Sequence, residues 1–150
     1  MEGSRHERDH EEQLESPTEY ISVERQFEDI GTDIVAVNRI GYPGPLLDLL
    51  SGEIPLKIGL GLQDDLRRLR ADFQFEPDGF LDLQNYVQAF RIDEKGLKKI
   101  SGIVLNRRIS KSQQVSNWDA DILSEAQLRY AATDAWICLM IYNSLRDSIK

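Results

Sequence analysis

The sequence predicts an α/β domain in which helices pack on a single sheet. Short segments with the composition of strands come first, strand and helix patterns then alternate, and the chain ends in helical patterns. Elements in this order are typical of one sheet covered by helices. The length of 150 residues corresponds to one domain.

Residues 20–62 contain three predicted strands and one predicted helix. Strands are predicted at Tyr20–Val23 and, because of its β-branched residues, at Asp33–Val37. Pro45 suits the first position of a helix that continues over the leucines as far as Leu50. The apolar run Lys57–Leu62 predicts a buried strand.

The rest of the chain is predicted to be mainly helical. A helix with leucines inward and arginines outward follows residue 65, and Phe80–Leu83 is a short strand that leads into an amphipathic helix. Another helix is predicted at Leu97–Leu105. Ser124 and Gln127 have the spacing of a capping box, which predicts a last helix to about residue 145.

Composition predicts a soluble cytoplasmic protein. The longest apolar run is eight residues, Ala135–Tyr142, whereas a membrane span needs about 20. The start of the chain has no apolar segment of the kind found in a secretory signal. The single cysteine, Cys138, excludes an internal disulfide and suits a reducing compartment.

Charge is distributed unevenly along the chain. The net charge is -8, of which residues 1–56 contribute -9 and residues 57–150 contribute +1. The segment Arg91–Lys111 is basic and can attract a phosphate backbone at short range. The alternative is that its side chains form an ordinary solvated helix surface.

Asp65, Tyr130 and Asp134 are the candidate residues of a functional site. Asp65 stands where a predicted strand gives way to a helix, and Asp134 lies in a largely apolar helix, four residues after Tyr130. At this spacing the Tyr130 hydroxyl and the Asp134 carboxylate share one helix face. A buried carboxylate needs a base, a donor or a metal. The alternative is that Tyr130 simply donates a hydrogen bond to Asp134 and that Asp65 caps a helix.

The sequence around these residues resembles that of the DEDD 3′–5′ exonucleases. The resemblance is strongest to the ribonuclease D branch, which includes the Werner-type exonuclease domain. The motifs that carry the resemblance follow one another in family order between about Asn38 and Leu145: Lys57–Asp65, Lys111–Gln113, Ser116–Trp118 and Tyr130–Trp136. A tyrosine four residues before the aspartate marks the tyrosine subclass; the histidine subclass has histidine at the position that Arg129 occupies.

The resemblance implies a ribonuclease H-like mixed sheet with flanking helices. It also implies that Asp65 and Asp134 bind divalent metal, Mg²⁺ or Mn²⁺, and that Tyr130 orients the water that attacks the terminal phosphodiester. The implied partner is a single-stranded or 3′-ended nucleic acid, DNA or RNA, tracked by basic residues such as Arg67. Trp118, on a polar loop, is either a packing residue or a platform for a base.

The family's first motif, an Asp-x-Glu on a central strand, has one counterpart here, Asp9–Glu11. Its surroundings are polar, whereas a central strand is nearly all apolar. We therefore expect residues 1–19 to be a flexible polar segment and residues 20–150 to be an N-terminally incomplete exonuclease-like domain whose central strand is missing or replaced. The alternative function is a catalytically impaired or inactive relative that binds nucleic acid or a protein.

Overall fold

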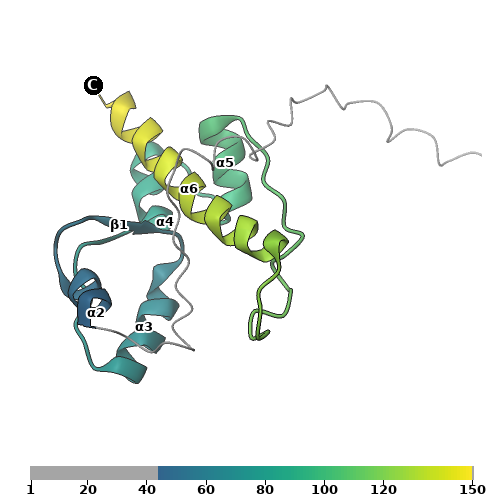
Figure 1. Ribbon diagram of the computed structural model, residues 1–150. Helices are drawn as coiled ribbons and strands as arrows, with labels where there is room; N and C mark the ends of the chain where they lie inside the picture. The colour runs from purple at the N-terminus through teal and green to yellow at the C-terminus, as the bar shows by residue number, and fades with distance from the viewer. Residues whose placement is uncertain (1–43, 150) are drawn as a thin grey trace, which may run out of the picture.

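The computed structural model describes residues 44–149 (Figure 1). The predicted strands Tyr20–Val23 and Asp33–Val37, the segment 1–19 and the Asp9–Glu11 motif lie outside these residues. In chain order the elements are α2 (Gly44–Ser51), β1 (Lys57–Gly59), α3 (Leu62–Phe73), β2 (Phe80–Asp82), α4 (Leu83–Tyr86), the 3₁₀-helix η2 (Val87–Phe90), α5 (Leu97–Leu105) and α6 (Glu125–Ser148).

Strands β1 and β2 pair in parallel, with Ile58 opposite Leu81. Helix α3 makes the crossover between them, as a parallel pair requires. The predicted α/β class is therefore confirmed, and within residues 44–149 the sheet has these two strands.

Strand β1 is shorter than the predicted Lys57–Leu62. The reason is Gly61, whose φ of 68° places it in the left-handed region, where glycine carries no steric penalty. The chain turns there, and Leu62 becomes the first residue of α3 instead of the end of the strand.

The core lies between the sheet and α6. Leu83, Ile100, Ile137 and Ile141 are fully or almost fully buried, and α6 packs against both α5 and β1. Figure 1 shows α6 as the longest element, with α5 beside it. The apolar residues of α6 lie in the same core as those of α5 and α4. This packing fixes the position of the Tyr130–Trp136 motif, which is part of α6, relative to β1.

The helix predictions are confirmed where the structure describes them. Helix α5 has the predicted bounds, and the Ser124–Gln127 capping box is present, with α6 running three residues beyond the predicted end at Leu145. The predicted helix near residues 86–90 is split into α4 and η2. No helix within residues 44–149 combines the length and the apolar character that a bilayer span requires.

Lys57 joins α2 to the sheet. Its Nζ donates to the backbone oxygens of Leu49, at 3.0 Å, and of Gly52, and it lies 5.1 Å from the centre of the Phe80 ring. Carbonyl oxygens at the end of a helix attract a cation, so this ammonium stabilises the end of α2.

Candidate active site

Tyr130 and Asp134 lie on one face of α6, one turn apart. The capping box fixes where this helix begins, and the regular i, i+4 spacing then brings the two side chains together. The Tyr130 hydroxyl and the Asp134 carboxylate are close enough to influence each other's pKa. The structure thus confirms that the two side chains share one face of the helix.

The pair faces a cavity of about 460 Å³. Strand β1 and the residue after it form one wall, the start of α5 forms a second, and the loop after α5 forms a third. The lining residues are Ile58, Gly59, Leu60, Gly96, Leu97, Lys98, Ile109, Ser110, Lys111, Gln114, Tyr130, Asp134, Ala135 and Cys138. The cavity therefore contains one carboxylate, one phenol and two amines among mainly apolar groups.

Burial dominates the electrostatics of this helix face. It raises the pKa of Asp134, and the hydrogen bond from Tyr130 opposes the rise. The pKa of Tyr130 is also raised, first by burial and then by the Asp134 charge, so the phenol keeps its proton at neutral pH. Burial, together with the charges of Asp134 and Asp82, raises the pKa of Cys138 to about 12.

Asp65 lies apart from this cavity lining. It is exposed in the first turn of α3, and the alternative in which it caps that helix is wrong, because the N-cap position belongs to Gly61. Its convergence with Asp134 stays a prediction. Within residues 44–149, no group of three or more acidic, histidine or cysteine side chains could hold a metal ion.

Asp82 does the capping that was expected of Asp65, and the sequence analysis missed it. Its carboxylate accepts hydrogen bonds from the backbone amides of Gly61 (3.0 Å) and Leu62 (2.8 Å) at the start of α3, and from Gln84 (2.9 Å) at the start of α4. An aspartate between a strand and an apolar helical run is an N-cap signal, so the cap on α4 could have been predicted from the sequence. The cap on α3 could not, because it depends on the parallel pairing of β1 with β2.

The loop before α6 is held by Gln127, which is buried. The Gln127 carboxamide donates to Ser116 Oγ (3.0 Å) and to the Asn117 carbonyl (2.9 Å), and it accepts from the Ser124 amide (2.9 Å). These bonds fix the backbone on both sides of Trp118. The exposed Trp118 ring thereby lies beside Tyr130.

Comparison with known proteins identifies the class to which this fold and site belong. Residues 19–150 match the 3′-5′ exonuclease family. The chain therefore belongs to this family, as the resemblance to the ribonuclease D and Werner-type enzymes implied.

Relatives in sequence and in structure agree with this class. The chain is 36% identical over 106 residues to human exonuclease 3′-5′ domain-containing protein 2, an alignment that covers 67% of this chain and 17% of the human protein. It is 31% identical to ribonuclease D of Haemophilus influenzae, over 70% of this chain and 27% of that enzyme. The chain thus spans well under half the length of these relatives.

The fold also matches that of a solved structure. Brucella melitensis NrnC superposes with a TM-score of 0.63 and 32% sequence identity, over 72% of this chain and 54% of that protein. A second structure of the same protein, bound to pGG, superposes with a TM-score of 0.60 and 31% identity, over 69% and 51%. These neighbours confirm the expected exonuclease-type, ribonuclease H-like α/β fold.

Proposed function

We propose that this chain is a metal-dependent 3′–5′ exonuclease that removes nucleotides from the 3′ end of a nucleic acid strand by two-metal phosphodiester hydrolysis. The observation that carries the proposal is the pair of Tyr130 and Asp134, one turn apart on α6, at the wall of an open cavity. Membership of the 3′-5′ exonuclease family supports it. A tyrosine–carboxylate pair alone is compatible with many hydrolytic activities. Membership of the family favours 3′–5′ exonuclease activity among them.

Tyr130 and Asp134 have complementary parts in this proposal. The phenol keeps its proton at neutral pH because its pKa is raised. Its single proton is directed at Asp134, so its oxygen can accept a hydrogen bond from an attacking water and orient that water toward the phosphorus. Asp134 interacts with the phenol and so favours its orientation.

The proposed cofactor is Mg²⁺ or Mn²⁺, with Asp65 and Asp134 as ligands. Such cations prefer carboxylate oxygens and neutralise the charge on a phosphoryl group. Within residues 44–149, Asp134 is the one carboxylate that lines the cavity, so these residues alone do not complete a two-metal site.

The proposed substrate is a single strand with a free 3′ end, either DNA or RNA. The complex of the related NrnC with pGG supports a nucleic acid ligand. The cavity is large enough for one unstacked nucleotide and has the apolar lining that a base requires. A cytoplasmic location stays a prediction.

The test is the incubation of a 5′-labelled single strand with the chain and Mn²⁺ or Mg²⁺. We expect a ladder of products shortened from the 3′ end and its loss on addition of EDTA. Asp134→Asn and Tyr130→Phe should lower the rate by about 100-fold or more, whereas Asp72→Asn and Tyr142→Phe, outside the cavity lining, serve as matched controls. Products cut internally would contradict the direction of attack. Binding without cleavage would instead identify the inactive exonuclease-like domain.

A further inference from the structure

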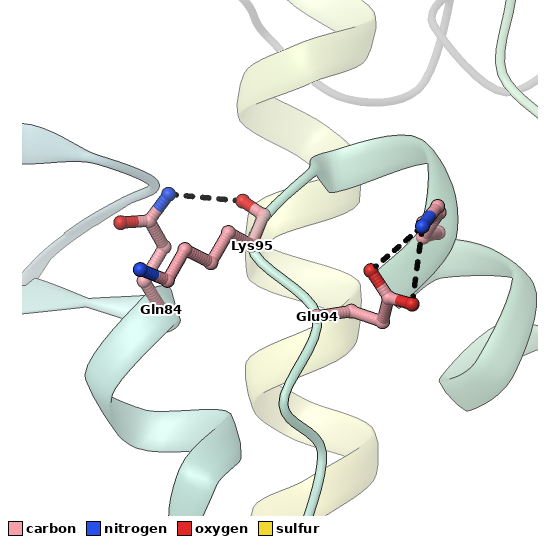
Figure 2. Close-up of polar contacts among 4 residues, drawn as sticks. Gln84, Glu94 and Lys95 are labelled. Atoms are coloured by element: carbon pink, nitrogen blue, oxygen red, sulfur yellow. Dashed lines mark hydrogen bonds and ion pairs between the residues drawn. The ribbon is translucent and has the colours of Figure 1, made fainter.

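The structure separates the basic residues of this chain into those that already have a partner and those that do not. In the segment Arg91–Lys111, Lys99 Nζ lies 3.1 Å from the Glu94 carboxylate. Figure 2 shows the Glu94 side chain pointing away from that of Lys95, whose backbone oxygen accepts a hydrogen bond from Gln84. On α3, Arg67 pairs with Asp64 at 3.1 Å. These cations are partly neutralised, so they are weaker attractors for another anion.

Lys98 and Lys111 are different. Both are exposed and line the cavity that contains Tyr130 and Asp134, one from the first turn of α5 and the other from the loop after α5. Within the described part of the chain, neither takes part in an ion pair. Two segments separated by a whole helix thus bring two unpaired ammonium groups to one cavity.

These two ammonium groups reverse the sign of the charge in the cavity. Asp134 alone would repel a phosphodiester, whereas two lysines beside one carboxylate leave a net positive charge at neutral pH. Both lysines line the same cavity as Asp134. Salt does not fully screen the interaction between charges that share one cavity, because the physiological Debye length is about 8 Å. A strand can therefore enter without a prohibitive electrostatic cost.

The rest of the lining limits the kind of anion that fits. Ile58, Leu60 and Leu97 offer apolar surface next to the lysines. A small inorganic anion would leave this surface exposed to water, while a nucleotide would cover it with its base and place its phosphate at the ammonium groups. Phosphate contacts of this kind supply affinity without sequence preference.

We propose that Lys98 and Lys111 bind the phosphodiester backbone of the strand whose 3′ end occupies this cavity. They are positioning residues: they set the affinity for the strand and its path to Tyr130 and Asp134. This inference rests on the proposed function, because it assigns the phosphate contacts of the same site. Lys99, adjacent in sequence but paired with Glu94, has no such part.

The first test measures binding in the absence of cleavage. A short 5′-fluorescein-labelled oligothymidylate is titrated with the chain in EDTA at several salt concentrations, and anisotropy gives Kd. Lys98→Gln combined with Lys111→Gln should weaken binding roughly tenfold and lower the slope of log Kd against log salt by about 1.4, at about 0.7 for each lost contact with a single strand. The matched control Lys99→Gln removes the same kind of charge one residue away and should leave the slope unchanged.

A competition arm identifies the group that is bound. Unlabelled dTMP should displace the labelled strand from the wild-type chain more effectively than thymidine, and this preference should vanish in the double variant. Equal competition by dTMP and thymidine in the wild-type chain would overturn the assignment of a phosphate contact.

Failure of this inference differs from failure of the proposed function. If the wild-type chain produces the 3′-shortened ladder but the double variant keeps its KM and salt slope, the lysine assignment is overturned and the exonuclease proposal stands. If the wild-type chain does not cleave but its binding depends on both lysines, the cleavage proposal fails and the phosphate assignment stands. A wild-type chain that does not bind the strand at low salt would overturn the inference.

Discussion

The indole ring of Trp118 lies against the phenol ring of Tyr130, with 6.1 Å between the ring centres and 50° between the planes. Tyr130 in turn interacts with Asp134. Through Trp118, the loop before α6 therefore packs against Tyr130, the side chain that we propose lies beside the reacting phosphate.

Loss of the Trp118 ring should loosen this support. A tilted aromatic pair contributes about 1 kcal/mol beyond its buried area, so we expect Trp118→Ala to lower the free energy of unfolding by at least this amount and Trp118→Phe to lower it less. Urea denaturation measures the change. Val115→Ala, in the same loop but 93% exposed, should have almost no effect, and a similar loss in that control would contradict a specific role for the ring pair.

Gln127 should be more important for stability than an ordinary glutamine. Gln127→Ala removes three hydrogen bonds, those to Ser116, Asn117 and Ser124. We expect a loss of about 2 kcal/mol or more, measured by thermal or chemical unfolding. Gln88→Ala, at an exposed position of η2, is the control; equal losses in the two variants would mean that the loop is held by other contacts.

Asp82→Ala should destabilise the junction between the sheet and two helices. The carboxylate serves three backbone amides at once, and we expect its removal to cost about 2 kcal/mol or more. Hydrogen exchange should show faster exchange at the first turn of α3. Asp72→Ala, exposed on the same helix, should leave that exchange unchanged, and unaltered protection at Gly61 and Leu62 in the Asp82 variant would contradict the capping role.

The stability of the chain should depend on the protonation of Asp134. Because burial raises its pKa above the ordinary 3.8, this group's stabilising contribution is complete below about pH 3.8 and is lost as pH rises through the folded-state pKa. At neutral pH, Asp134→Asn should therefore unfold at a higher temperature than the wild-type chain, although it loses activity. The difference should shrink toward low pH in differential scanning calorimetry; a less stable variant at pH 7 would contradict this sign.

Cys138 should be inert in the folded protein. Its pKa is raised from 9.0 to about 12, mainly by burial, so the thiolate is scarce at pH 8 and a disulfide reagent should react only after unfolding. The same shift predicts that stability falls as pH rises above about 9, since the unfolded thiol ionises first. Stoichiometric labelling of the native chain at pH 8 would show that the thiol is accessible.

Local patterns were sufficient for much of the fold. The leucines and isoleucines of Leu97–Leu105 recur with helical period, and the Ser124–Gln127 pair satisfies the first amides of α6 from within the same turn. Such features depend on neighbours in the chain, so they can be predicted without knowledge of the rest of the molecule. The contact of Tyr130 with Asp134 is predictable for the same reason.

The cap on α3 could not be predicted in this way. Asp82 reaches Gly61 and Leu62 because β1 and β2 lie side by side, which is a contact between residues about 20 positions apart. Asp65 has the better local signal for the cap, yet it lies in the first turn beyond the capping position.

By itself, the sequence determined the class of fold, the family motifs and the shared helix face of Tyr130 and Asp134, because periodicity and short spacings act within a few residues. Tertiary structure decided which charges face the cavity. Lys98 and Lys99 are neighbours in the chain, but one lines the cavity with Lys111 and the other pairs with Glu94. Successive residues of a helix point about 100° apart, and only the packing of the helix determines what each of them meets.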